Sequence, residues 1–404
     1  MAITDKEEGV WNLDEVYNKI NQGSIWEYTG IRNFFTWGDN NDGQLALNIP
    51  NDQDRSSPVQ VSGNTWASHY KGNMGNMATK TDGTLWTWGD NYNGQGALNL
   101  NSPNYSSPMQ VGADTTWSTD VNGKFSSMTN YGWSAIKSDG TLWSWGGNYN
   151  GFLGLNQAGG SMTANARSSP TQVGSDSTWA ILADGNAFRE NGGVKTDGTM
   201  WIWGRNDNGT FGNDRTDRSS PTQIPGTTWS TDPHKFVIAA YGSVQAIKTD
   251  GTLWSWGGNG YGGLGQNNAA SRSSPVQLPG TYKCVGGRWY QRNAIKTDGT
   301  LWSWGYNLSG SLGHNNKTNY SSPKQVGTDT SWSYCQCFDY GNGKGGMLAT
   351  KTDGTFWTWG NNENGELGHN NTTDYSSPKQ VPGTAWTGST LTSAMQHNSC
   401  LQIQ

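Results

Sequence analysis

The sequence predicts an all-β protein, a seven-bladed β-propeller, from three observations. The dipeptide Trp-Gly occurs seven times, the tripeptide Ser-Ser-Pro occurs seven times, and the two markers alternate along the chain. Successive Trp-Gly markers lie 48 to 58 residues apart. A period of this size, with several short strands in each unit, is typical of propellers and not of helical solenoids. The marker residues are Trp37, Trp88, Trp145, Trp203, Trp256, Trp304 and Trp359, and Pro58, Pro108, Pro170, Pro221, Pro275, Pro323 and Pro378.

One repeat shows how a blade is built. Asp139-Gly140 separates two alternating runs, which predicts a β-hairpin with a type I′ turn, a turn that needs positive φ at both central residues. Trp143 and Trp145 then share one face of the next strand, because side chains alternate along a strand. After a Gly/Asn loop, residues 168–173 are expected to form an edge strand, since a proline cannot donate to a sheet ladder.

The composition supports this architecture. The chain has 404 residues, with 23 Trp and 57 Gly, although only 32% of its residues are hydrophobic. Disordered chains are poor in aromatic residues, so these indoles must be buried in a folded core. Nineteen of the 23 Trp occupy recurring repeat positions and are expected to be core residues. Trp11, Trp26, Trp133 and Trp289 lie outside the repeated positions.

The two ends of the chain predict how the ring closes. The first unit, which starts near Arg32, lacks the strand that precedes Trp-Gly in other units. The tail Ser399–Gln404 resembles that missing strand. We therefore predict that the C-terminal strand, Cys400–Gln404, completes the first blade and removes the exposed edges of an open array. Residues 31–404 would form the propeller, and residues 1–30 a separate N-terminal segment.

Charge and motifs exclude several function classes. The net charge is −5 without a Lys/Arg-rich run, so no nucleic-acid partner is expected. No apolar run approaches the roughly 18–20 residues of a membrane span, and no basic and apolar signal region begins the chain, so neither membrane insertion nor classical secretion is expected.

The sequence also lacks the marks of an enzyme. No nucleophile elbow, phosphate-binding loop or zinc-protease motif occurs, which predicts a non-enzymatic protein without cofactor or metal. The repeated Asp of Asp-Gly is interpreted as a turn residue. Cys335 and Cys337 form a C-x-C without a second pair, and the four cysteines are expected to be structural.

The repeat resembles a known family. The pattern Asp-Gly-Thr-Leu-Trp-x-Trp-Gly-x-Asn-x-x-Gly-x-Leu-Gly, as in 250–265 and 298–313, is similar to the regulator of chromosome condensation repeat. This resemblance implies a seven-bladed propeller, and the family includes a guanine-nucleotide exchange factor, many scaffolds, and bacterial and phage chains. The acidic start and the lack of an inserted wedge depart from the exchange factor, so the fold is expected to transfer and exchange activity is not.

The first thirty residues are expected to contain a short helix. Asn12 and Glu15 form a capping pattern ahead of one apolar face. The candidate attachment residues are Trp11, Leu13, Val16, Tyr17, Ile20 and Trp26. This face either docks onto the propeller or binds a partner. The segment resembles N-terminal segments of structural proteins from marine tailed phages.

Variable loops ahead of the second strand of each blade form a candidate ligand face. These loops are expected to converge on one face of the propeller, where aromatic and Arg side chains can stack on sugars or anchor a protein. Alternatively, they plug the central channel or cover the rim. The candidate residues are Tyr131, Trp133, Arg189, Tyr241, Arg288, Trp289, Tyr290 and Tyr340.

Two functions fit this sequence. The first is a phage virion structural protein, a capsid decoration or tail-associated appendage. It would bind other virion proteins through the N-terminal segment and a host-surface glycan or protein through the propeller, and it would reside in the virion after assembly in the host cytoplasm. The alternative is a cytoplasmic protein-interaction scaffold or GTPase regulator.

Overall fold

The computed structural model describes thirteen ranges of the chain, together with Ser161. These are residues 32–63, 65–71, 75–100, 102–120, 124–128, 132–157, 164–184, 189–211, 215–239 and 242–339, followed by 344–382, 386–393 and 397–403. Apart from two 3₁₀ turns, η2 (Pro233–Lys235) and η4 (Gly260–Gly262), the regular structure in these ranges is β-strand. The helix expected within residues 1–30 lies outside the described residues.

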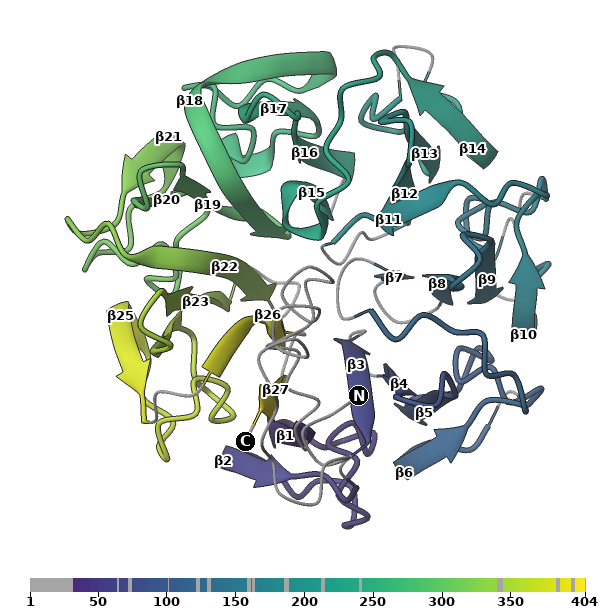
Figure 1. The fold of residues 1–404 in the computed structure, drawn as a ribbon. Helices are drawn as coiled ribbons and strands as arrows, with labels where there is room; N and C mark the ends of the chain where they lie inside the picture. The colour runs from purple at the N-terminus through teal and green to yellow at the C-terminus, as the bar shows by residue number, and fades with distance from the viewer. Residues whose placement is uncertain are drawn as a thin grey trace, which may run out of the picture.

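The strands form four-stranded antiparallel units arranged around a ring, with one strand of each unit near the centre and one at the rim (Figure 1). We call these units blades 1 to 7. Blade 1 contains β1 (Arg32–Gly38), β2 (Arg55–Gln60), β26 (Trp386–Ser393) and β27 (His397–Ile403); blade 2 contains β3 (Trp66–Lys71), β4 (Gly75–Lys80), β5 (Leu85–Gly89) and β6 (Tyr105–Gln110); blade 3 contains β7 (Phe125–Met128), β8 (Gly132–Ile136), β9 (Leu142–Gly146) and β10 (Arg167–Gln172).

The remaining blades follow the same order. Blade 4 contains β11 (Trp179–Leu182), β12 (Glu190–Lys195), β13 (Met200–Gly204) and β14 (Arg218–Ile224); blade 5 contains β15 (Phe236–Ala239), β16 (Ser243–Ile247), β17 (Thr252–Gly257) and the first part of β18 (Arg272–Arg288); blade 6 contains the second part of β18, β19 (Gln291–Lys296), β20 (Leu301–Gly305) and β21 (Tyr320–Gln325); blade 7 contains β22 (Trp332–Asp339), β23 (Gly345–Lys351), β24 (Phe356–Gly360) and β25 (Tyr375–Val381).

Strand β18 belongs to two blades. Its 17 residues pair with β17 through Arg272–Thr281 and with β19 through Tyr282–Arg288, so blades 5 and 6 form one seven-stranded sheet. Counting the two parts of this sheet separately gives seven four-stranded units, the number that the seven marker pairs predict.

The C-terminal part of the chain closes the ring. Strand β27 pairs along the whole of β1, from Arg32↔Ile403 to Gly38↔His397, and β26 pairs with β27 on its other side. The predicted closing strand is therefore confirmed, and the C-terminal contribution is larger than predicted because β26 also belongs to blade 1. Residues of blade 7 complete the contact: Asn370 N donates to Ser56 O at 3.1 Å.

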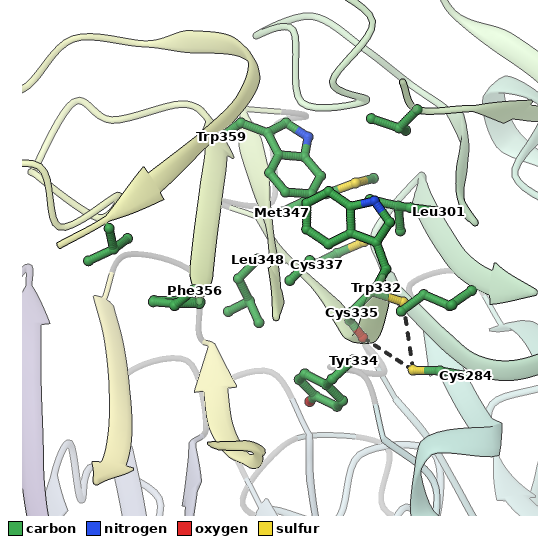
Figure 2. Packing of buried hydrophobic residues seen from close by; sticks show 14 of the residues in the cluster. Cys284, Leu301, Trp332, Tyr334, Cys335, Cys337, Met347, Leu348, Phe356 and Trp359 are labelled. Atoms are coloured by element: carbon green, nitrogen blue, oxygen red, sulfur yellow. Dashed lines mark hydrogen bonds between the residues drawn. The ribbon is translucent and has the colours of Figure 1, made fainter. Parts of the chain in front are cut away.

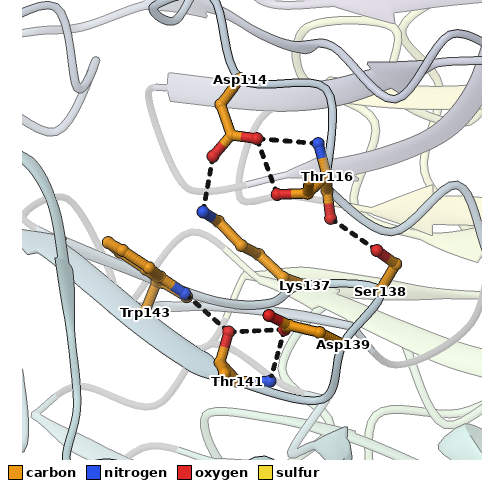
Figure 3. Close-up of polar contacts among 7 residues, drawn as sticks. All are labelled: Asp114, Thr116, Lys137, Ser138, Asp139, Thr141 and Trp143. Carbon is orange, nitrogen blue, oxygen red and sulfur yellow. Dashed lines mark hydrogen bonds and ion pairs between the residues drawn. The ribbon is translucent and has the colours of Figure 1, made fainter.

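The Asp-Gly hairpins differ from the predicted type I′ turn. Only the glycine has positive φ, as at Gly140 (81°), and Gly140 N donates to Lys137 O. This is a three-residue loop in which a tight turn is followed by a left-handed glycine. Figure 3 shows why Asp is required: Asp139 Oδ1 accepts from Thr141 N and Oγ1 at 3.0 and 2.7 Å, and Trp143 Nε1 donates to Thr141 Oγ1. The interpretation of Asp as a turn residue is confirmed.

A lysine stack lies beside each of six such turns. The last lysine of the second strand lies over the first Trp of the Trp-x-Trp-Gly strand, with Nζ 3.6 to 4.3 Å from the ring centroid. The lysines are Lys80, Lys137, Lys195, Lys248, Lys296 and Lys351. Lys137 also binds Asp114 in the loop that enters its blade, Nζ to Oδ2 2.5 Å (Figure 3).

The Trp-Gly markers make contacts between blades. Six of the seven Trp-Gly indoles donate to a backbone carbonyl of the preceding blade at 2.7 to 3.1 Å. The pair Trp37 Nε1 to Glu366 O joins blade 1 to blade 7. The left-handed glycine that ends Gly-x-Leu-Gly permits this approach: a Cβ on Gly265 would lie 2.9 Å from Trp304 Nε1. The repeat markers are therefore the residues that bind each blade to the next.

The core lies between blades, as Figure 2 shows for blades 6 and 7, where Trp332 and Trp359 pack over Met347. Cys284, Cys335 and Cys337 are buried free thiols in this cluster, and Cys284 Sγ lies 3.6 Å from Cys335 Sγ. These three cysteines behave as the small buried residues that the sequence predicts.

Candidate functional site

The topology gathers two kinds of loop at one end of the blades. The hairpin between the first and second strands and the loop between the third and fourth strands open at the same end, since neighbouring strands are antiparallel. We call this end the loop face. The Asp-Gly turns lie at the opposite end. The candidate ligand residues belong to the first kind of loop or to the strand ends beside it.

The hairpin of blade 6 is the tightest described loop of this kind. Arg288 pairs with Gln291, which leaves only Trp289 and Tyr290 in the turn. Trp289 has φ +44°, a strained value for a bulky residue. The buried Arg292 holds this conformation, because its Nη1 donates to Trp289 O at 2.8 Å and to Gln291 O at 2.6 Å.

Burial lowers the pKa of Arg292 to about 10, so the guanidinium remains charged at neutral pH beneath the turn. Gly287 makes room for it: a Cβ there would lie 2.8 Å from Arg292 Cδ. The hairpin is therefore a rigid support for its two aromatic side chains.

Three tyrosines from two blades meet beside this hairpin. The ring centroid of Tyr261, from the last loop of blade 5, lies 4.8 Å from that of Tyr290 and 4.4 Å from that of Tyr306. Tyr261 is 50% exposed, whereas Tyr290 and Tyr306 are half-buried. Gly260 lets the loop approach, because a Cβ there would lie 2.5 Å from Tyr290 Cε1. We call Tyr261, Tyr290 and Tyr306 the tyrosine patch.

The other candidate ligand residues lie elsewhere. Arg189 stacks on Tyr149 between blades 3 and 4, with Cζ 3.9 Å from the ring centroid. Arg288 is buried in β18, and Trp289 is only 9% exposed behind Tyr290. Tyr131, Tyr241 and Tyr340 lie outside the described residues, as do the attachment residues Trp11, Leu13, Val16, Tyr17, Ile20 and Trp26.

Trp133 corrects the expectation of an exposed ligand residue. It is 3% exposed and packs in the core cluster of blades 2 and 3 with Phe125 and Trp145. The reason is register: strand β8 begins at Gly132, so Trp133 already belongs to the sheet, opposite Ser127 and Trp145. Trp133 therefore has no surface with which to stack on a ligand.

Tyr261 and Tyr306 were not among the predicted site residues. Position 306 follows Trp-Gly, where the other repeats carry Asp39, Asp90, Gly147, Arg205, Gly258 and Asn361. Position 261 precedes a loop glycine, where most repeats carry Asp or Asn. An aromatic residue at a polar repeat position was the signal that could have identified them.

The inner end of the loop face is bridged across the channel. Gln336 Nε2 of β22 donates to Asp184 Oδ2, which follows β11, at 2.6 Å. Nearby, Glu190 is buried and its pKa is raised to about 7, mainly by desolvation. Its Oε2 accepts from Arg189 N at 3.1 Å, and Coulombic attraction to Arg205 opposes the rise. Within the ranges that the structure covers, no cluster of three or more His, Cys, Asp or Glu has the arrangement of a metal site.

Fold and loop arrangement define the class of this protein as a β-propeller. In particular, four of its repeats match the family model of the Regulator of chromosome condensation (RCC1) repeat, at residues 33–69, 250–287, 298–337 and 353–389. The predicted family resemblance is confirmed. The resemblance of the N-terminal segment to phage structural proteins gains no support from these matches.

Curated proteins are also similar to this chain. The chain is 27% identical over 260 residues to the ultraviolet-B receptor of Arabidopsis thaliana, covering 60% of this chain and 53% of the receptor. It spans about half the length of the curated relatives it matches.

Two solved structures share the fold. Human WBSCR16 has a TM-score of 0.75 at 18% identity, with 92% of this chain and 99% of that chain covered. Prp20p of Saccharomyces cerevisiae has a TM-score of 0.75 at 16% identity, with 98% and 95% covered. Among the described residues, no helix has the length and apolar character needed to cross a membrane.

Proposed function

We propose that this chain is a non-enzymatic binding propeller that holds a protein partner on its loop face through the tyrosine patch. The observation that carries the proposal is the convergence of Tyr261, Tyr290 and Tyr306 from two blades at positions where other repeats are mostly polar. Tyrosine is enriched at interface hot spots, since its ring buries a large apolar area and its hydroxyl remains available for hydrogen bonding.

The support beneath the patch favours binding. The two-residue hairpin is fixed by Arg292, and Tyr290 packs against the loop at Gly260. A surface that is ordered before the partner arrives loses less conformational entropy on association, which raises affinity without further contacts.

The relatives favour the interaction role over the virion role. The solved structure of Prp20p was described together with its binding properties to Gsp1p and histones, and another structure shows Kap60 bound to yeast RCC1. A GTPase regulator is a narrower form of the same function, and no contact among the described residues favours it over another protein partner. None of the relatives named above is a virion protein, so the virion role and host-surface binding remain predictions without support.

The division of the chain also remains a proposal. We propose residues 31–404 as the propeller and residues 1–30 as an attachment segment that uses Trp11, Leu13, Val16, Tyr17, Ile20 and Trp26. Deletion of residues 1–30 tests this: the propeller should unfold at the same urea concentration, and a shift to lower urea would indicate docking onto the propeller instead.

Site-specific photo-crosslinking tests the main proposal. A benzophenone amino acid would replace Tyr261 in the full chain, in cells that naturally make it, and adducts would be identified by mass spectrometry. Tyr92 is the matched control, because it is 76% exposed in the corresponding loop of blade 2. We expect a discrete adduct from position 261 that position 92 does not give. Identical adducts from both positions, or none from position 261, would contradict the proposal.

A further inference from the structure

A groove lies between blades 5 and 6, on the rim side of the lysine stack. It has a volume of about 570 Å³ and runs along the fourth strand of blade 5, from Arg272 at one end to Pro279 at the other. Its wall on blade 6 is formed by Tyr282, Lys296 and Trp302. The corresponding groove between blades 3 and 4 has a volume of only about 340 Å³.

The loop that enters blade 6 explains the difference. Blade 4 is entered through Val173-Gly-Ser-Asp176-Ser-Thr-Trp179, whereas blade 6 is entered through Leu278-Pro-Gly-Thr-Tyr282, which is two residues shorter and ends in Tyr. Tyr282 is buried, and its hydroxyl donates to Pro279 O at 2.9 Å, so the short loop is held in place.

The missing residues include the carboxylate that neutralises the stacked lysine elsewhere. In three blades this carboxylate lies 2.5 or 2.6 Å from Nζ, in the pairs Lys137–Asp114, Lys195–Asp176 and Lys351–Asp329. Lys296 Nζ lies 3.8 Å from the Trp302 centroid, and no described carboxylate forms an ion pair with it. Asp298 in the adjoining turn does not replace the missing group, because its Oδ1 accepts from Thr300 N and Oγ1, as in every repeat of this type.

We propose that this groove binds an extended acidic peptide segment, with one of its carboxylates on Lys296 where blades 3, 4 and 7 place their own Asp. The three internal pairs show that the position beside a stacked lysine accepts a carboxylate. The groove lining contains Arg272 and Lys296 and no acidic residue, so it is complementary in charge to such a ligand.

The length of the groove favours a peptide over a single small anion. Residues 272–278 are an extended strand, which spans roughly 20 Å, and Arg272 lies at the end away from Lys296. A peptide of about seven residues in extended form can place one carboxylate at each end. Between them, Trp302 offers a ring surface and the exposed Gln277 offers a side-chain amide.

Among the described residues, no Asp forms an ion pair with Lys80 or Lys248 either, but the groove differs at their blades. Their entry loops are one residue longer than that of blade 6 and end in Trp66 and Trp229, which lie over the same lysines at 5.2 and 5.1 Å. Blade 6 therefore combines the shortest entry loop, Tyr282 in place of Trp, and Lys296, with which no described carboxylate forms an ion pair.

This inference rests on the proposed function only in taking the partner to be a protein. The test uses the full chain and two fluorescent peptide pools, one with Glu at both ends of six randomised positions and one with Gln at both ends. Fluorescence anisotropy should show the Glu pool binding at least tenfold more tightly than the Gln pool. Free glutamate at the same concentration should not compete, because it reaches only one end of the groove.

Three variants locate the binding. Lys296→Met keeps the aliphatic packing on Trp302 and should reduce affinity for the Glu pool about tenfold, whereas the control Lys195→Met should leave it unchanged. Replacing residues 279–281 with Gly-Ser-Asp-Ser-Thr, the sequence of residues 174–178, supplies an internal carboxylate and should abolish binding.

Peptide binding in the groove can be tested independently of partner binding at the tyrosine patch. Tyr261→Ser should bind the Glu pool normally even if the tyrosine patch proves to have no partner. Equal affinity for the two pools, or unchanged binding by Lys296→Met with an unaltered circular dichroism spectrum, would overturn the proposal.

Discussion

The hydrogen bond from a Trp-Gly indole to the preceding blade can be measured by comparing two buried tryptophans. Trp304 and Trp359 are both fully buried at the same repeat position. Trp304 Nε1 donates to Gly263 O at 2.9 Å, whereas Trp359 Nε1 has no acceptor within the described residues. Changing each to Phe removes the same atoms, so the difference between the variants reports the bond between blades.

The expected losses follow from these contacts. Removing the larger ring from a packed site costs about 1–2 kcal/mol at either position. Trp304→Phe additionally loses a hydrogen bond worth about 1 kcal/mol, for a total of about 2–3 kcal/mol, while Gly263 O keeps the bond from Gln245 Nε2 at 3.3 Å. Trp359→Phe instead removes a buried N–H without a partner, so its total should stay near 1 kcal/mol.

Urea unfolding followed by far-ultraviolet circular dichroism measures both values, provided that the denaturant slope is unchanged. An equal loss of stability in the two variants, or a larger loss in Trp359→Phe, would refute the assigned role of the indole bond.

Three further predictions concern a buried acid, the ring closure and a turn. Because burial raises the pKa of Glu190 from 4.5 to about 7, folding stability should fall as pH rises between these values; Glu190→Gln should be more stable than the parent by roughly 3 kcal/mol at pH 8 and equal near pH 4, and a constant difference in urea titrations across pH would contradict this. A chain ending at residue 385 loses β26 and β27 and should be recovered mainly as aggregate, since β1 then becomes an open edge; a monomer of unchanged melting temperature would show that these strands do not close the ring. Gly299→Ala should cost about 2–4 kcal/mol by thermal unfolding, because φ is +83° and the Cβ would lie 1.9 Å from Thr330 O, whereas Gly327→Ala, with φ +61° and open space, should cost about 1 kcal/mol; equal costs would exclude the clash.

The fold was predictable because the repeat markers are themselves the contacts between blades. Trp-Gly supplies the indole that bonds to the preceding blade, and the first serine of Ser-Ser-Pro accepts from that blade's loop, as Ser56 O does from Asn370 N. A marker of this kind recurs at every blade, so its period counts the blades. The turn type was wrong because hairpin sequence alone does not reveal that Asp139 caps Thr141 in a three-residue loop.

The candidate site was only partly predictable. Trp289 and Tyr290 were found because they interrupt the repeat, whereas Trp133 was misplaced because a one-residue difference in strand start decides between loop and core. Tyr261 and Tyr306 are 45 residues apart in sequence, and only the packing of adjacent blades brings their rings together. The groove at Lys296 depends on an entry loop one or two residues shorter than its equivalents, a difference whose effect appears only when blades are compared in space.

Strand β18 gives the ring a mechanical asymmetry. Elsewhere, a connecting loop between successive sheets can flex, and small rotations of one blade against the next are possible there. Between blades 5 and 6, the 17-residue strand β18 continues from one blade into the next within a single sheet. We therefore expect these two blades to move together as one rigid unit. Relative motion of neighbouring blades should therefore be largest at the other junctions, and amide hydrogen exchange should be slowest along β18. The tyrosine patch and the groove both lie on blades 5 and 6, where motions of the other blades disturb their geometry least.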